Sequence, residues 1–229
     1  MRSTSLEGLN TFDRWWAQPG EWVEPPNQRK VGESGVQRLR SSAGPLLYSK
    51  RQIGQLYRTP LYPVGRPTVL RELQALRALK RLGIKVPEVV YGAAQKIAGE
   101  WHALLVTEAL EGFSSLEQWY ADEGARRWGL ALHQQMLQQL ALILARLHLS
   151  GWQHGALYPK HIFIRVHASE GPRVEIALLD LAKCRRRFSR YAASRGDLQQ
   201  LSRHRRPLGN SDWRVFIEAY QNAFDSDYL

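Results

Sequence analysis

The spacing of apolar residues changes near residue 111, from the pattern of strands to the pattern of helices. Over 21–52, short apolar runs alternate with turn residues, and "GVQRLR" and "PLLYSKRQ" flank "SSAG", which is typical of a hairpin. "VPEVVYGAAQKI" and "WHALLVTEAL" predict two further strands, joined at Ala98 and Gly99. One long helix is predicted among these strands, over 67–82, because its leucines recur on one helical face.

Beyond "EGF" the spacing favours helices. "HQQMLQQLALILARLHLSG" places Met136, Leu140 and Leu144 on one face, and "SSLEQWYADEG", "RGDLQQLSRH" and "SDWRVFIEAYQNAF" predict three more helices. "HIFIRV" and "RVEIALLDLA" form a predicted hairpin between them. We therefore predict an α+β fold in two lobes. The N-terminal lobe, 1–111, has a short leading helix, strands and the helix over 67–82, and the C-terminal lobe, 112–229, is helical with one hairpin.

Charge is concentrated in one part of the chain. The 229 residues carry a formal net charge of +11, and residues 183–206 alone hold nine Lys or Arg against one Asp. Such a segment suits phosphate-bearing partners, such as nucleic acid, anionic lipid or a phosphorylated glycan, and equally suits a solvated basic surface. One cysteine, Cys184, excludes an internal disulfide, and no secretory or membrane-spanning pattern is present, so a cytoplasmic protein is expected.

The segment "GWQHGALYPKHIFIRV" carries a frame found in phosphotransferase catalytic loops, where H-x-D-L-x-x-x-N precedes a short strand. His154 and Leu157 fit this frame. Ala156 stands at the position of the base Asp, and His161 at that of the Asn. An imidazole titrates near neutral pH, so His154 or His161 could act as the base. The alternatives are that His154 holds the loop from within the core and that His161 packs beside a metal.

Other residues fit a phosphate site. Gly32 and Gly35 precede a predicted strand, where glycines allow backbone N–H groups to approach phosphate oxygens, although a plain hairpin turn needs them too. Lys50 ends an apolar strand and could reach phosphates, with Glu72 on the following helix as its ion-pair partner. Both could equally be solvated. An extended strand would direct Lys50 and Arg51 to opposite faces.

Two aspartates follow. Asp180 comes directly after a predicted buried strand, where a carboxylate is costly unless a cation such as Mg²⁺ pairs with it. Asp197 is predicted to cap a helix at "SRGDLQQL". In kinase-like folds an Asp at this place also holds the catalytic loop by its backbone.

Taken in order, "LLYSKRQ", "RPTVLREL", "HALLVTEALEGF", "HGALYPKHIF" and "LLDLAKCRRR" resemble the lipopolysaccharide kinase family. "FDRWWAQPGEWVEPPNQRKVGESGVQRL" and "YPVGRPT" resemble its InaA-type branch of acid-inducible proteins from Gram-negative bacteria. The resemblance covers nearly the whole chain and implies a bilobal, protein-kinase-like fold. It implies a family whose active members use ATP and Mg²⁺ to phosphorylate sugars of the lipopolysaccharide core at the inner face of the cytoplasmic membrane.

By position, the resemblance makes Lys50 the ATP-phosphate lysine and Glu72 its helical partner. Asp180 becomes the metal-binding Asp, and Glu108 to Leu110 the hinge that meets adenine through backbone groups. Ala156 and His161 depart from the family pattern, at the base and at the second metal ligand.

Three hypotheses stay open. The first is an ATP-dependent kinase acting on a lipopolysaccharide core sugar or a related anionic acceptor, with peripheral contact to the anionic inner membrane through 183–206. The second is a pseudokinase that binds nucleotide or another ligand as a stress-response sensor, which Ala156 favours. The third, a nucleic-acid binder, is disfavoured because the sequence has no helix-turn-helix or zinc signature. We expect nucleotide to bind between the two lobes.

Overall fold

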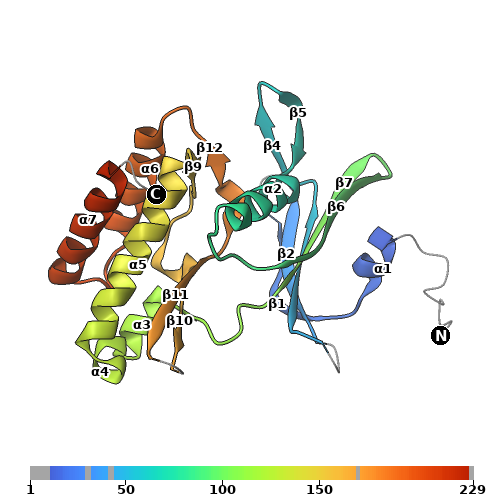
Figure 1. Cartoon of the computed structure of the whole chain (residues 1–229). Helices are drawn as coiled ribbons and strands as arrows, with labels where there is room; N and C mark the ends of the chain where they lie inside the picture. The colour runs from blue at the N-terminus through green and yellow to red at the C-terminus, as the bar shows by residue number, and fades with distance from the viewer. Residues whose placement is uncertain (1–10, 29–31, 41–43, 169–170, 227–229) are drawn as a thin grey trace. The chain divides into compact units, whose positions relative to one another are not determined.

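We describe the protein from a computed structural model, in which the structure describes residues 11–28, 32–40, 44–168 and 171–226 (Figure 1). The chain divides into two compact units. Unit 1 comprises Met1–Gln74 and Glu88–Ala109, and unit 2 comprises Ala75–Pro87 and Leu110–Leu229.

Unit 1 is built on a five-stranded sheet in the order β1-β2-β3-β7-β6, and neighbouring strands are antiparallel. The strands are β1 (Glu21–Gln28), β2 (Glu33–Leu39), β3 (Leu47–Ile53), β6 (Val89–Ile97) and β7 (Glu100–Glu108). Both hairpins predicted from the sequence are present. In the β6–β7 turn, Ala98 and Gly99 have φ of 49° and 85°, and this pair of left-handed residues matches the twist of a two-residue hairpin turn.

The helix α1 (Thr11–Ala17) packs against this sheet through aromatic side chains. Phe12 is buried with Leu104 and Val106 of β7, and its ring stacks on Trp16 with 5.5 Å between centroids. Trp15 stacks on Tyr91 of β6 at 6.1 Å. The leading helix therefore contributes part of the core of unit 1.

A further hairpin, of β4 (Leu56–Thr59) and β5 (Tyr62–Pro67), forms a separate two-stranded sheet that the sequence did not predict. Three prolines within 60–67 hide it, since proline argues against a central strand and is tolerated at sheet edges. The long helix α2 (Thr68–Arg81) follows directly, close to the predicted 67–82. Its residues up to Gln74 belong to unit 1 and the remainder to unit 2.

Unit 2 is organised around α5 (Leu130–Leu149). The predicted apolar face of α5 is fully buried at Met136, Leu140, Leu144 and Leu147. It packs against α7 (Asn210–Asp225), α6 (Arg190–Arg203) and β11 (Arg173–Leu178). Two short helices precede it: the predicted α3 (Leu116–Ala121), which Ser115 caps, and α4 (Gly124–Trp128), which the sequence did not reveal.

The predicted hairpin of unit 2 consists of β10 (Ile162–His167) and β11, which pair antiparallel, with β8 (Ser114–Ser115) on the other side of β10. A second small sheet pairs β9 (Trp152–Gln153) with β12 (Arg185–Arg186). Between them lie two short 3₁₀ helices, η1 (Pro159–His161) and η2 (Leu181–Lys183). The loop from Gly151 to His161 thus begins beside β9 and ends where β10 begins.

Among the residues that the structure describes, no helix has both the length and the apolar character that crossing a membrane requires.

Candidate active site

In unit 1, the strand β3 presents Lys50 to α2. Lys50 Nζ donates to Glu72 Oε2 at 2.7 Å, and Glu72 is buried with 7% of its surface exposed. Lys50 keeps 20% of its side chain exposed. The ion pair predicted from the sequence is therefore present, while its part in binding ATP stays a prediction.

Arg51 points to the other face of β3, as strand alternation predicts. Its guanidinium donates to the Gln18 carbonyl oxygen at 2.7 Å and lies over the Trp16 ring at 5.7 Å. Burial lowers the pKa of Arg51, which nevertheless stays charged. Arg51 thus fastens α1 to the sheet, and of the two neighbours Lys50 is the phosphate-binding candidate.

Local packing accounts for both glycines that the sequence singled out. Gly32 has φ of +76°, and a Cβ there would lie 2.2 Å from the Ile53 carbonyl oxygen. Gly35 lies inside β2, where a Cβ would meet the Trp22 ring at 2.7 Å. Backbone conformation and close strand packing are thus sufficient reasons for glycine at both positions, and phosphate binding by either stays a prediction.

The end of β7 carries the predicted hinge, Glu108 to Leu110. Two of its backbone donors already serve the fold of unit 1: Glu108 N–H donates to the Glu88 carbonyl at 2.9 Å, and Ala109 N–H donates to the Leu46 carbonyl at 2.8 Å. The Leu110 N–H is the next donor along the chain. The adenine contact predicted for Glu108 to Leu110 stays a prediction.

In unit 2, a buried carboxylate on α6 holds the catalytic-loop-like segment. Asp197 is fully buried; its Oδ2 accepts from His154 N–H at 2.6 Å and its Oδ1 from Gly155 N–H at 2.8 Å. Gln200, one turn further on, accepts from Leu157 N–H at 3.1 Å. The loop-holding role that the sequence analysis gave Asp197 is thus confirmed.

The capping role predicted for Asp197 is wrong. The helix α6 begins at Arg190, and its cap is Ser189, whose side chain accepts from Tyr191 N–H. Asp197 instead lies inside the helix, where His148 Nε2 lies 3.2 Å from its Oδ2. His148 Nδ1 in turn lies 2.8 Å from the Tyr220 hydroxyl, which donates to Ser194 Oγ at 2.7 Å. This buried network ties α5, α6 and α7 to the loop, and its partners lie too far apart in the chain for a motif to reveal them.

His154 supports the loop from within the core. It is fully buried, and its Nδ1 accepts from the Ala156 N–H at 3.3 Å, so Nε2 carries the proton. Burial lowers the pKa of His154 to about 4, although the charge of Asp197 opposes the shift. A neutral, buried imidazole whose Nδ1 is already engaged favours the loop-holding alternative over the role of base.

His161 and Asp180 lie together at the other end of the loop. His161 Nδ1 donates to the Ala156 carbonyl oxygen at 2.7 Å, and Nε2 lies 3.6 Å from Asp180 Oδ2. Asp180 has φ of 58° and ψ of 65°, a left-handed conformation that a non-glycine residue rarely adopts and that recurs at functional sites. The structure therefore brings together the two residues to which the sequence gave a metal role.

Magnesium binding by Asp180 and His161 stays a prediction, and the chemistry of the two side chains bears on it differently. Within the residues that the structure describes, no cluster of three or more metal-ligating side chains occurs. Mg²⁺ in kinases is held by one or two protein ligands and completes its shell with phosphate oxygens and water. Asp180 offers the hard oxygen that Mg²⁺ prefers, whereas the imidazole of His161 is a softer ligand than the amide oxygen of an Asn.

Ala156 lies between these two histidines and offers no proton acceptor in its side chain. It is buried, with 3% of its surface exposed, and its backbone N–H and carbonyl are both engaged, with His154 and His161. The loop therefore keeps the backbone frame of a phosphotransferase loop with a methyl group at the base position.

The basic segment 183–206 is largely exposed. Its single acid, Asp197, is turned into the core, so the surface charge of the segment comes from cations alone. Seven of its nine cationic residues are exposed: Lys183, Arg185, Arg186, Arg187, Arg195, Arg203 and Arg206. Phe188, in the middle of this run, is also fully exposed.

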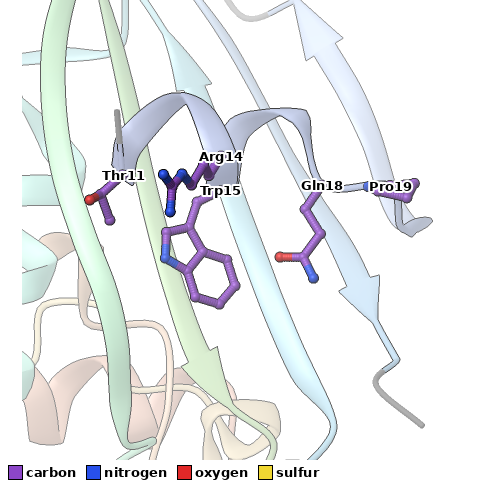
Figure 2. Close-up of a pocket in the computed structure, with 5 residues that line it drawn as sticks. All are labelled: Thr11, Arg14, Trp15, Gln18 and Pro19. Atoms are coloured by element: carbon purple, nitrogen blue, oxygen red, sulfur yellow. The ribbon is translucent and has the colours of Figure 1, made fainter. Parts of the chain in front are cut away.

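A depression lies at α1, and none of its lining residues is one that the sequence assigned to chemistry. Its volume is about 520 Å³, and Figure 2 shows the residues that line it: Thr11, Arg14, Trp15, Gln18 and Pro19. All five belong to α1 or directly follow it.

Comparisons with known proteins agree with these features. Residues 13–220 match the sequence model of a family described as "Lipopolysaccharide kinase (Kdo/WaaP) family". The chain is 41% identical over 212 residues to "Protein InaA" of Escherichia coli (strain K12), an alignment that covers 93% of this chain and 95% of that protein.

A solved structure, "WaaP in complex with acyl carrier protein", is similar to 94% of this chain and to 84% of its own, with a TM-score of 0.70 and 19% identity. That likeness shows the fold, which is the kinase-like α+β fold predicted from the sequence. On the family match and the 41% identity, the chain belongs to the lipopolysaccharide kinase (Kdo/WaaP) family.

Proposed function

We propose that the protein binds ATP with Mg²⁺ and transfers its terminal phosphoryl group to an anionic acceptor of the lipopolysaccharide-core type, at a rate that Ala156 keeps low. The observation that carries the proposal is the partly buried ion pair between Lys50 and Glu72. The family of the protein indicates the class of reaction, and the residues of this chain determine how much catalytic activity it keeps.

Withdrawing this pair from water costs free energy, so its presence favours a functional role over a purely structural one. Removing two charges from water costs several kcal/mol per ion, and apolar side chains of the same volume often stabilise a fold as well or better. An ammonium can donate three hydrogen bonds, and Glu72 Oε2 accepts one of them, with 2.7 Å between Nζ and Oε2. Glu72 would therefore orient the Lys50 ammonium for contact with phosphate oxygens.

The second requirement is neutralisation of phosphate charge. Phosphoryl transfer depends mainly on positioning and on electrostatic stabilisation, which a bound Mg²⁺ supplies. Asp180 would hold the ion through its carboxylate, with His161 Nε2 as the neighbouring ligand, and His161 Nδ1 anchored to the Ala156 carbonyl fixes the ring for that purpose.

The third requirement, a base for the acceptor hydroxyl, is the one that the loop lacks. A positioned base contributes about 10²–10⁴-fold to the rate. His154 is buried and neutral, so the imidazole that could accept the proton is that of His161, through Nε2. The same atom cannot hold a metal and accept a proton at once, which is a further reason for slow transfer.

The acceptor class follows from the surface of unit 2 and from the family. An exposed run of arginines over 183–206 suits phosphates or carboxylates on the acceptor, and suits peripheral contact with the anionic inner membrane. The phosphoryl transfer would then take place at the inner face of the cytoplasmic membrane.

A second candidate is a nucleotide-binding sensor without catalysis, and Ala156 is the observation that favours it. In that case the Lys50–Glu72 and Asp180–His161 pairs would serve ligand binding alone. Turnover separates the two candidates, because both require the nucleotide.

The decisive experiment combines nucleotide binding with turnover. Thermal unfolding with ATP and Mg²⁺ should show stabilisation in the native chain that is lost in Lys50→Met and retained in Lys80→Met, an exposed lysine on α2. Single-turnover transfer from radiolabelled ATP to purified lipopolysaccharide core then distinguishes kinase from sensor. Stabilisation by ATP that is equal in Lys50→Met and the native chain would contradict both candidates.

A further inference from the structure

The β4–β5 hairpin ends in apolar side chains that project into solvent. Thr59 pairs with Tyr62 across the turn, so Pro60 and Leu61 form its end, and Figure 1 shows the hairpin extending from unit 1. Leu61 is 84% exposed and Val64 is 85% exposed. Tyr62 lies between them, partly exposed. We call Leu61, Tyr62 and Val64 the hairpin tip.

The base of the hairpin is fixed to the rest of unit 1. Thr68 N–H donates to the Gln55 carbonyl at 3.0 Å, and the Thr68 hydroxyl donates to Gln52 Oε1 at 2.6 Å. Arg71 of α2 lies over the Tyr57 ring at 4.6 Å. Pro60 and Pro63 restrict the backbone beside the tip. The exposed side chains therefore project from a hairpin whose base is fixed to unit 1 by hydrogen bonds and a cation–π contact.

The stretch of sequence that contains the tip carries cations and no acidic residue. From Lys50 to Arg71 the sequence contains no Asp or Glu, and Arg58 and Arg66 lie on the two strands behind the tip. Arg66 donates to the Tyr62 hydroxyl at 2.7 Å and lies over its ring at 4.8 Å. The tip is thus apolar at its end and positively charged along its sides.

We propose that the hairpin tip inserts into the interfacial region of an anionic lipid bilayer. Leu61 and Val64 would enter the acyl boundary, Tyr62 would lie at headgroup level, where tyrosines are enriched, and Arg58 and Arg66 would meet lipid phosphates. The chemistry of the tip favours an anionic bilayer as its partner, because the apolar end suits the bilayer interior and the cationic sides suit the anionic surface.

The shape of the tip argues against a folded protein as the partner. Protein interfaces bury about 800 Å² on each side over some 20–30 residues. A hairpin end with two largely exposed aliphatic side chains offers far less area, whereas insertion into a bilayer would bury both side chains. Each side chain would then contribute to membrane binding the full free energy of transfer from water to an apolar phase.

This inference goes beyond the proposed kinase activity. It names a second membrane contact, in unit 1, independent of the basic segment 183–206 in unit 2. Stable peripheral attachment generally needs two weak signals, such as an apolar anchor and a polybasic patch. Binding to lipid can be measured without turnover, so failure of one proposal leaves the other standing.

The first test measures co-sedimentation with vesicles of phosphatidylcholine and phosphatidylglycerol. Leu61→Ser should weaken partition about tenfold or more, and Val64→Ser by a smaller factor, because less apolar surface is lost. Leu130→Ser is the matched control, since Leu130 is 73% exposed at the start of α5, and it should leave partition unchanged. Equal partition of Leu61→Ser and the native chain would overturn the proposal.

The second test reports the depth of the tip directly. The single native cysteine, Cys184, is buried, so a cysteine introduced by Leu61→Cys can be labelled alone with an environment-sensitive fluorophore. Its emission should shift to the blue on adding anionic vesicles, while the same label at exposed Gln221 (Gln221→Cys) should not respond. If the emission of the label at position 61 shifts to the blue on adding unlabelled protein without vesicles, the tip associates with a second copy of the chain, which would contradict lipid insertion.

Discussion

At the scale of single residues, Ala156 decides between catalysis and binding. Replacing it with Asp should restore a proton acceptor and raise transfer or ATP hydrolysis by about 10²-fold or more. Affinity for ATP should stay roughly unchanged, because Lys50 and Glu72 act on phosphates and not on the acceptor. Initial rates and thermal shifts measured on the same preparation check both expectations.

The matched control for this change is Ala156→Asn, which has nearly the same volume and no basic carboxylate. Because Ala156 is buried, both variants meet the same steric demand, and only the Asp variant should gain rate. Native turnover of several per second that is lost in His161→Ala would instead make the imidazole the base and contradict the slow-transfer proposal.

His154 makes the stability of the fold depend on pH. Its pKa is lowered by burial to about 4 in the folded chain, whereas the unfolded chain keeps the ordinary value near 6.5. The unfolded state therefore binds more protons between these values, and stability falls as pH drops from about 6.5 towards 4. The loss from this one group is on the order of 3 kcal/mol.

A His154→Asn variant isolates that contribution. The Asn oxygen can accept the Ala156 N–H as Nδ1 does, but it does not titrate. Urea unfolding of both proteins across this pH range should show a smaller acid-induced loss in the variant. An identical loss in the two proteins would mean that other groups carry the pH dependence.

At the scale of elements, α6 holds the loop through Asp197. Asp197→Ala would leave two buried N–H groups and His148 without their acceptor, so it should cost about 3–5 kcal/mol. Urea unfolding measures this cost. Asp122→Ala, an exposed aspartate at the end of α3, should stay within about 0.5 kcal/mol. A small effect at Asp197 would show that the loop does not depend on α6.

The sequence predicted elements where one strong pattern sets them. Leucine spacing predicted α2 and α5, and strand alternation separated Lys50 from Arg51, because burial of one face decides these patterns locally. It predicted α6 but placed its start too late, since "RYAASR" has little apolar periodicity and Asp197 resembled a cap. It also missed the β4–β5 hairpin, whose prolines argue against strands. The links from His148 to Tyr220 depend on tertiary packing alone.

At the scale of the whole molecule, the net charge of +11 should make attachment to anionic surfaces sensitive to salt. The triple variant Arg185→Glu, Arg186→Glu, Arg187→Glu should weaken co-sedimentation with anionic vesicles and flatten its salt dependence. The reason is that these three side chains are exposed in the densest part of the basic segment.

The control reverses three exposed cations elsewhere, Arg77→Glu, Lys80→Glu and Arg81→Glu on α2, and so produces the same net charge. If both triple variants bind equally weakly, overall charge governs attachment and 183–206 has no special part in it. Equal binding of the native chain to neutral and anionic vesicles would contradict electrostatic attachment altogether.

The network that joins the loop to Tyr220 has a consequence for the order of events during synthesis. A ribosome adds about 5–20 residues per second, so the loop exists for several seconds before α7 is made. Throughout that interval His148 lacks its hydroxyl partner, and the apolar face of α5 lacks the helix that covers it. Unit 2 should therefore complete its fold only after α7 has been synthesised, and until then α5 is a natural binding site for chaperones on the nascent chain.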